Sequence, residues 1–353
     1  MEFDNKLKIL NKPPVKSIHT KFGDIYDCIN IYKQPAFDHP LLKNHKIQMK
    51  PNVVRKDQSD EPISNIISSS VRSKVEGCPL DTVPIRRTTK QDLVNAELLT
   101  SWIKQRHFVS VQPFAEKVYY GASARITVAN PGVEQDKYST GQIWIQKGPA
   151  EELNSIEFGW AVHPQLFGDN DTRVFGLWTA DGFKETGCYN MLCPGFVQIH
   201  PEYTFGERIK ASTYGAWVQR AFDFSVHRDL ESGNWWFING VDNAKIGYWP
   251  KEIFTHLASN ASVIGYGGAA GGEFGEPSPP MGHARLPVYD SRSTCCHVYM
   301  KLINDKGIYV DFDRSHVQLN HDTKTSCYDL IFPGREIFRG NIMLFGGPGG
   351  DCP

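Results

Sequence analysis

Residues 154–162, NSIEFGWAV, alternate large apolar side chains with small or polar ones. Successive side chains of a β-strand point to opposite faces. This alternation therefore predicts a strand with one large apolar face and one face of small residues that also carries Glu157. The GDND sequence at residues 168–171 predicts a turn, and residues 173–180 predict the returning strand. We therefore expect an antiparallel hairpin at the centre of the chain.

Short alternating runs continue from Phe108 toward the C-terminal end, separated by Gly, Pro and Asn. No strand–helix–strand alternation occurs there, which predicts antiparallel pairing in an all-β sandwich or barrel. We expect further strands at residues 124–129, 142–146, 195–200, 214–227, 234–239, 261–267, 296–303, 307–312 and 341–345.

One helix is predicted before this region. Thr89 and Asp92 stand at the spacing of a capping box, and Val94, Leu98 and Trp102 follow at helical spacing. We expect the helix to run to about residue 105, with its apolar face in a core or a docking surface.

Glu157 is the best catalytic candidate of the chain. Its neighbours on the small-residue face are Ser155, Gly159 and Ala161, which would leave space for an extended substrate. A strand glutamate is, however, more often a solvated surface residue. If Glu157 is catalytic it needs a second carboxyl, because two close carboxyls can divide the acid and base roles. Such a pair suits an acidic peptidase or a glycosidase, and periodicity does not choose between them.

Charge is balanced over the whole chain but not along it. The net charge is −1, yet residues 1–107 hold 18 of the 38 Lys and Arg and 12 of the 39 Asp and Glu, so this part is positive and the remainder negative. We expect the two parts to attract each other. The neutral total and the lack of a basic stripe argue against a nucleic-acid partner. The chain contains no apolar run of about 18 residues, so no membrane span is predicted.

Eight cysteines without paired CxxC spacing favour disulfides over a metal site, and hence an oxidising compartment. No apolar segment that could act as a secretory signal follows Met1, so we expect the signal to be absent from this chain. Asn170 and Asn260 stand in glycosylation sequons.

Several long motifs resemble the neprosin family of plant glutamic peptidases. They are NSIEFGWAV, TGCYNMLCPGFVQ, GNWWF, IGYWP, GYGG followed by PPMG, CYDL and the terminal FGGPGGDC. LNKPPVKSI, GDIYDC, KQPAFDHPLLKNHKIQMKP and PIRRTT resemble that family's activation peptide. The motifs occur in order over essentially the whole chain.

This resemblance implies an antiparallel two-sheet β-sandwich at residues 111–353 behind a small α/β prosegment at residues 1–110. It implies a secreted or vacuolar zymogen that cleaves proline-containing peptides after proline at acidic pH. The family uses two glutamates and a water nucleophile, with no metal or cofactor, and the prosegment acts as an intramolecular inhibitor. Processing is expected within residues 86–120. The positions of Cys188 and Cys193, and of Cys327 and Cys352, pair in the family, whereas Cys28, Cys78, Cys295 and Cys296 are left unassigned.

The catalytic residues carry over only in part. Glu157 matches the first catalytic glutamate, in the family's I-E-x-G-W pattern. The second lies in a W-G-G-E pattern, which here reads Tyr266, Gly267, Gly268 and Ala269, so the glutamate is missing. Glu273 follows four residues later in a second GGE. Trp160 and the three residues before Ala269 are candidates for the substrate groove.

Two hypotheses follow. If the glycine-rich segment bulges, Glu273 enters the groove and restores the pair. Otherwise Glu157 is alone, and the protein is an inactive peptide- or glycan-binding relative of the peptidases. A lone carboxylate supplies only one of the two acid–base groups. The loss of one group typically lowers the rate by about 10²- to 10⁴-fold.

Overall fold

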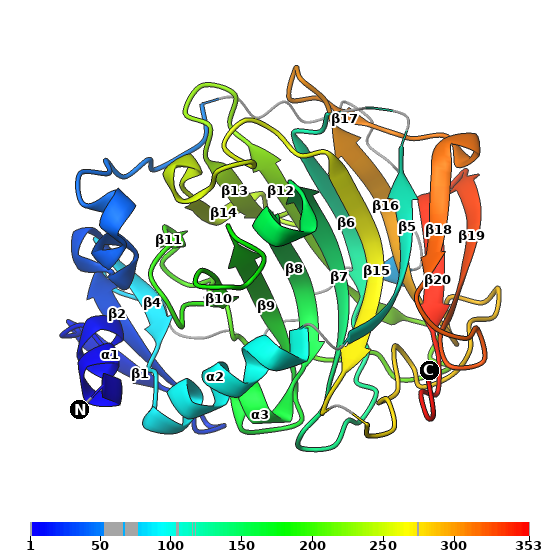
Figure 1. Cartoon of the computed structure of the whole chain (residues 1–353), viewed down its shortest axis with the longest axis horizontal. Coiled ribbons are helices and arrows are strands. Elements are labelled where there is room, and N and C mark those ends of the chain that lie inside the picture. The colour runs from blue at the N-terminus through cyan, green and yellow to red at the C-terminus, as the bar shows by residue number, and fades with distance from the viewer. Residues whose placement is uncertain are drawn as a thin grey trace.

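A computed structural model describes residues 2–52, 66–67, 77–103, 106–114, 116, 118–273 and 275–352. Two large, mainly antiparallel sheets pack face to face, and a smaller N-terminal unit lies beside them (Figure 1). This confirms the predicted all-β sandwich with a small α/β unit before it. No helix among the described residues is long and apolar enough to cross a membrane.

The first large sheet contains the predicted hairpin. Its order is β10 (Cys188–Tyr189), β9 (Thr172–Thr179), β8 (Asn154–Val162), β7 (Tyr138–Lys147), β15 (Val263–Gly271), β5 (Arg106–Pro113) and β18 (Val317–His321). All its pairings are antiparallel. Strands β8 and β9 form the central hairpin, joined through the short helix α3 (Pro164–Phe167).

The second large sheet has ten strands. Its main order is β11 (Val197–Gln198), β14 (Ala244–Trp249), β13 (Trp235–Asn239), β12 (Gln219–Arg228), β6 (Gly121–Thr127), β16 (Cys295–Ile303), β20 (Gly340–Gly346) and β19 (Asp329–Glu336). β17 (Tyr309–Val310) pairs with β16, and β3 (Ile66–Ile67) pairs with β12.

The apolar face of β8 forms part of the core between the two sheets. The Phe158 ring lies 5.7 Å from Phe237 and 6.3 Å from Phe224, both in the second sheet. Trp160 is fully buried, and its indole N–H donates to the Thr127 carbonyl of β6 at 2.9 Å. The alternation read from the sequence therefore sets which side of β8 faces the core and which side carries Glu157.

The N-terminal unit is an α/β arrangement. It consists of α1 (Glu2–Leu10), the sheet β1 (Lys16–His19), β2 (Ile25–Asn30) and β4 (Thr82–Arg86), and α2 (Lys90–Ile103). Short 3₁₀ helices lie at Ile31–Lys33, Pro35–Asp38, Pro40–Leu42, Ala150–Glu152, Lys251–Ile253 and Arg314–His316.

Helix α2 begins as the capping box predicts. The Asp92 amide donates to Thr89 Oγ1 at 3.1 Å, and the Thr89 amide donates to the Asp92 carboxylate at 2.6 Å. The helix then runs beside α3 (Figure 1), where the Asn95 side chain donates to the Gln165 carbonyl. It ends at Ile103, and residues 104 and 105, to which we expected it to extend, lie outside the described residues.

Three disulfides are present. Cys188–Cys193 and Cys327–Cys352 confirm the pairings that the resemblance implied. The third disulfide, Cys28–Cys78, cross-links two segments of the N-terminal unit. Cys295 and Cys296 are free and buried.

Candidate functional site

Glu157 lies in the middle of the first large sheet, on the face that points away from the inter-sheet core. Its cross-strand neighbours are Trp144 of β7 and Leu177 of β9. The side chain is only 1% exposed. The expectation that small neighbours leave open space above Glu157 is therefore corrected, because other side chains fill that space.

Arg106 is the main hydrogen-bond donor to the Glu157 carboxylate. Its two terminal nitrogens donate to the two carboxylate oxygens at 2.6 and 3.0 Å, in a bidentate ion pair. Burial alone would lower the pKa of Arg106, but the adjacent Glu157 outweighs burial and raises it. Both Glu157 oxygens are therefore engaged by this pair.

Arg106 is the first residue of β5, which is hydrogen-bonded to β15 on one side and β18 on the other. The boundary expected at residue 110 thus crosses a strand of the sandwich. That boundary remains a prediction. The guanidinium on Glu157 is nevertheless anchored in the sheet itself.

Two uncharged residues complete the immediate surroundings of Glu157. The Gln142 amide donates to Glu157 Oε2 at 2.6 Å, and Ser155 Oγ donates to Oε1 at 3.3 Å. Thr140 Oγ1 donates to Gln142 Oε1 at 2.6 Å, which fixes the amide with its N–H₂ group toward Glu157. Gln142 is 2% exposed, so this amide orientation is built into the interior.

Tyr138 and Tyr189 close the site on the side of β9 and α3. Both are buried, and burial raises the pKa of each tyrosine above its ordinary value. Tyr138 stacks on His163, which also meets Tyr189 edge to face. Burial lowers the pKa of His163 to about 3, so that imidazole is neutral at any pH well above that value.

Ala269 shares the face of Glu157. It stands opposite Thr140 on β7 and Phe108 on β5, and it is fully buried. Cross-strand partners point to the same side of a sheet, and Thr140 lies on the Glu157 side. The position where the resemblance places a second carboxylate therefore carries a methyl group directed into the site.

Glu273 lies outside the sheet. β15 pairs without a register shift with both neighbours through Gly271, so no bulge moves Glu273 toward the groove. Glu273 is exposed, and within the described part of the chain its side chain forms no hydrogen bond or ion pair. The structure does not bring Glu273 and Glu157 together.

Three groove candidates belong to the core. Trp160 reaches β6, the hydroxyl of fully buried Tyr266 donates to the Lys301 carbonyl at 2.8 Å, and a side chain at Gly268 would collide with Phe345 and Met281. They alternate with the residues of the Glu157 face. Gly267 does lie on that face, opposite Gln142.

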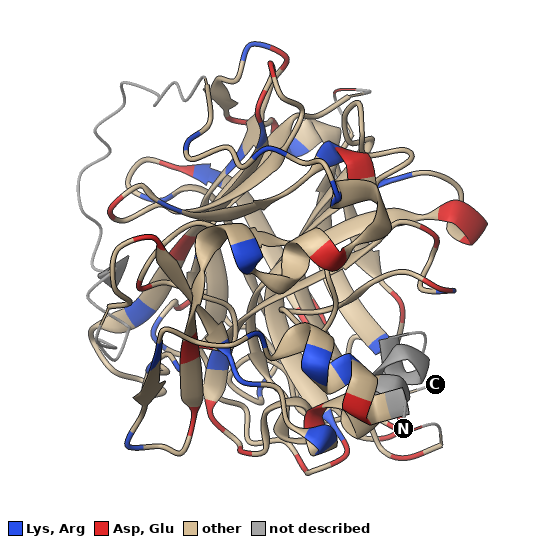
Figure 2. Ribbon diagram, turned by 90° about the vertical axis from the view of Figure 1, so that its left-hand side faces the viewer, with Lys and Arg blue, Asp and Glu red and all other residues tan. Residues whose placement is uncertain are grey.

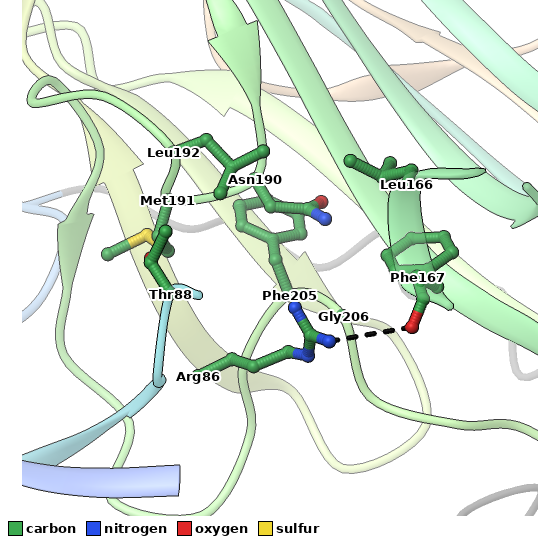
Figure 3. Close-up of a pocket in the computed structure, with 9 residues that line it drawn as sticks. All are labelled: Arg86, Thr88, Leu166, Phe167, Asn190, Met191, Leu192, Phe205 and Gly206. Atoms are coloured by element: carbon green, nitrogen blue, oxygen red, sulfur yellow. Dashed lines mark hydrogen bonds between the residues drawn. The ribbon is translucent and has the colours of Figure 1, made fainter. Parts of the chain in front are cut away.

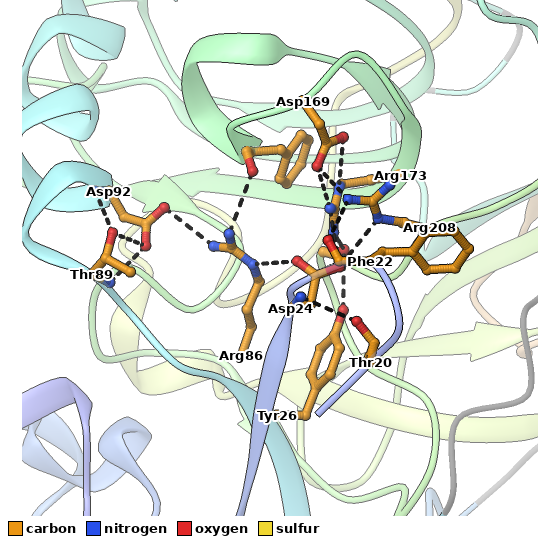
Figure 4. Close-up of polar contacts among 12 residues, drawn as sticks. Thr20, Phe22, Asp24, Tyr26, Arg86, Thr89, Asp92, Asp169, Arg173 and Arg208 are labelled. Atoms are coloured by element: carbon orange, nitrogen blue, oxygen red, sulfur yellow. Dashed lines mark hydrogen bonds and ion pairs between the residues drawn. The ribbon is translucent and has the colours of Figure 1, made fainter. Parts of the chain in front are cut away.

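The N-terminal unit docks on the sandwich through a buried ionic network (Figure 4). Asp24 accepts from Arg173 at 3.1 Å and from Arg208 at 3.2 Å, both in the sandwich, and from Arg86 at 3.2 Å. Burial by itself would raise the pKa of Asp24, but Arg173 and Arg86 outweigh burial and hold it below its usual value. Asp169 also accepts from both sandwich arginines.

At this contact, the charges on the two parts of the chain are the opposite of those that their net charges would predict. A prosegment carboxylate meets sandwich guanidiniums, although the prosegment is positive overall. Figure 2, which faces the prosegment side, shows Lys and Arg interspersed with Asp and Glu rather than separated into two fields. Individual pairs, rather than net charge, therefore hold this part of the interface.

The ionic contact is closely packed. Arg86 and Thr88 of the N-terminal part border a cavity of about 20 Å³ against Phe167, Met191 and Phe205 (Figure 3). A space of that size holds about one water molecule. Prosegment residues Ile29, Ile31, Leu42, Val83 and Ile85 also join the main core cluster of the sandwich. Apolar burial therefore supports docking together with the ion pairs.

The sequon asparagines lie on loops. Asn170 is exposed, whereas the Asn260 side chain accepts from Lys147 at 2.8 Å. Their glycosylation stays a prediction.

Sequence reasoning missed Arg106, Gln142, Tyr138 and the Asp24 network. Gln142 had a signal, since it lies on a predicted strand in alternation with Trp144 and Gln146. Arg106 had none, because its partner lies three strands away in the sheet.

Comparisons with known proteins agree with the motifs. The neprosin family profile matches residues 135–348, and the neprosin activation peptide profile matches residues 17–130. Two similar solved structures are scytalido-glutamic peptidase with a transition state analog inhibitor (TM-score 0.37, 9% identity) and SCP-B of the eqolisin family with the tripeptide Ala-Ile-His (TM-score 0.35, 9% identity). Each alignment covers 69% of this chain and 98% of the other. By the two profile matches, the chain belongs to the neprosin family and includes that family's activation peptide.

Proposed function

We propose that this protein is a latent glutamic-type endopeptidase of low activity that cleaves peptides after proline at acidic pH. The observation that carries the proposal is the placement of Glu157, a buried carboxylate in the middle of the sheet, with donors arranged on both oxygens. The proline preference and the acidic pH range rest on the family resemblance.

In this proposal Glu157 performs both proton transfers. It takes a proton from water while the water oxygen bonds to the scissile carbonyl carbon. It then gives that proton to the amide nitrogen as the carbon–nitrogen bond breaks. Ala269 supplies no second carboxyl to polarise the carbonyl. We therefore expect turnover to be lower than that of a two-carboxylate site by about 10²- to 10⁴-fold.

Latency has two sources in this proposal. The prosegment docks through Asp24 and a shared apolar core, and Arg106 covers Glu157 directly. Secretion or delivery to a vacuole fits the three disulfides, which persist in oxidising compartments.

The test is digestion of a proline-containing peptide by acid-treated protein across about pH 2.5 to 7, read by mass spectrometry, with Glu157→Gln and Glu273→Gln in parallel. Cleavage after proline that is lost in Glu157→Gln and kept in Glu273→Gln is the expected result. Loss of cleavage in Glu273→Gln would instead mean that Glu273 moves into the site.

A second candidate is a peptide-binding protein without catalysis. The specific observations in its favour are the methyl group of Ala269 and the bidentate Arg106 on Glu157. This candidate predicts that folded, prosegment-free protein binds a proline-containing peptide by calorimetry and leaves it intact at every pH.

A further inference from the structure

The Arg106 guanidinium occupies a built polar site. It meets a carboxylate that is 1% exposed, through two hydrogen bonds of 2.6 and 3.0 Å. Gln142 holds the same carboxylate in place at 2.6 Å and is itself oriented by Thr140. Gln142 thus helps to fix the carboxylate that receives the guanidinium.

Gly271, which has no side chain, leaves room for the Arg106 side chain on this face of the sheet. Arg106 and Tyr138 are both cross-strand partners of Gly271, one on each side, so all three share the Glu157 face. Gly271 places no side chain between the other two. Tyr138 is 2% exposed, and its hydroxyl has no hydrogen-bond partner within the described residues.

Arg106 lies in β5 of the sandwich, although the activation peptide profile extends over it, to residue 130. Its strand is paired on both sides through residues 106–113. Removing β5 would break the seven-stranded sheet between β15 and β18. A cut before Arg106 therefore leaves the guanidinium tethered beside Glu157.

We propose that the Glu157 carboxylate, held in place by Gln142, forms a binding site for a guanidinium or ammonium group, which Arg106 fills from within the chain. A peptide that carries arginine or lysine binds the same site when Arg106 is displaced. Such a peptide blocks Glu157 and acts as a competitive ligand. This inference concerns binding and does not depend on hydrolysis, so it stands or falls separately from the proposed peptidase activity.

The test uses the full-length Arg106→Gly protein, which leaves the cation site empty. Its ligands are acetyl-arginine amide and the neutral isostere acetyl-citrulline amide, with affinity measured by calorimetry and thermal stability measured in parallel. We expect the arginine ligand to bind at least about tenfold more tightly, because hydrogen bonds between charged partners are stronger than neutral ones. N-ethylguanidinium is expected to raise the thermal stability of this variant.

Two controls define the outcome. Arg106→Gly/Glu157→Gln has no unpaired carboxylate and should lose the preference for arginine. Arg87→Gly removes a partly exposed arginine whose partner is Asp27, and should show no rescue by N-ethylguanidinium. If Arg106→Gly does not fold alone, recovery of folded protein with N-ethylguanidinium is the same readout. Equal affinity for the two amides, or a preference that persists in the double variant, would overturn the proposal.

Discussion

Glu157 and Arg106 are buried together, so each depends on the other for compensation of its charge. Both carboxylate oxygens are already engaged, and the donors come from three strands, β5, β7 and β8. A variant that removes one charge leaves the other in a poorly solvated site, which is costly because a lone buried ion has no counter-charge. Substitutions used to probe chemistry at this site also change stability.

Glu157→Gln is accordingly expected to destabilise the full chain. The unpaired Arg106 guanidinium should reduce the free energy of unfolding by roughly 3 to 5 kcal/mol, measured by urea denaturation. Arg106→Met/Glu157→Gln, which removes both charges, should regain part of that loss. A single variant as stable as the wild type would contradict the ion pair.

Ala269 and Ala270 provide a matched test of which side of β15 faces the site. A glutamate at position 269 points toward Arg106 and gains a cationic partner. At position 270 it enters the inter-sheet core, because Ala270 belongs to the main apolar cluster. We expect Ala270→Glu to lose several kcal/mol more unfolding free energy than Ala269→Glu in urea denaturation. Equal losses would mean that the strand register is different.

At the scale of elements, the contacts of the N-terminal unit predict how acid affects its docking. Its titratable groups at the interface include Asp24, His39 and His45. His45 bonds to the Tyr248 hydroxyl at 2.9 Å and lies 3.7 Å from Glu252, and His39 packs against Trp178. Burial lowers the pKa of both histidines, for His45 despite Glu252.

Asp24→Asn should weaken docking of β2 by roughly 1.5 to 3 kcal/mol, because three charge-assisted hydrogen bonds lose their anion. The measurement is hydrogen-exchange protection of residues 25–30. The docked pKa of Asp24 is lowered, so its contribution is present above its ordinary pKa near about 4 and is lost as the pH falls further. Asp27→Asn is the control, since Asp27 pairs with Arg87 inside the prosegment. Equal effects of both variants would refute the role of Asp24 in docking the N-terminal unit on the sandwich.

His39 and His45 should act at milder pH. Their docked pKa values are lowered, so docking is most stable above the ordinary histidine value near about 6.5 and weakens as the pH drops toward the lowered values. We expect protection factors of residues 31–42 to fall between about pH 7 and 5. His39→Gln/His45→Gln should remove that dependence, whereas exposed His19→Gln should keep it. An unchanged pH dependence in the double variant would exclude these histidines as the trigger.

At the scale of the whole molecule, alternation and turn residues predicted the all-β class and the central hairpin, because those features are set by local periodicity. The resemblance supplied the two-sheet sandwich and two of the three disulfides. Strands β5, β10, β14, β18 and β19 were not among the expected strands, and the strand expected at 195–200 is only β11. These strands are completed by pairing with partners that no local pattern identifies. The bond from Arg106 to Glu157 depends on the order of strands in the sheet, which no local pattern specifies.

The same limit applies to the missing carboxylate. The sequence identified Ala269 at the expected position of a glutamate, but only the unbroken register of β15 shows that Glu273 lies outside the sheet and away from Glu157. In the proposed function, Glu157 is the active carboxylate and Ala269 stands where its partner would be.

The most direct test is the initial rate of cleavage of one proline-containing peptide at acidic pH by four processed proteins: wild type, Ala269→Glu, Glu157→Gln and the double variant. We predict weak cleavage after proline by the wild type, an increase of about 10²- to 10⁴-fold in Ala269→Glu, and none in either protein that lacks Glu157. Cleavage that survives Glu157→Gln, or a folded Ala269→Glu protein with no gain over the wild type, would contradict this account.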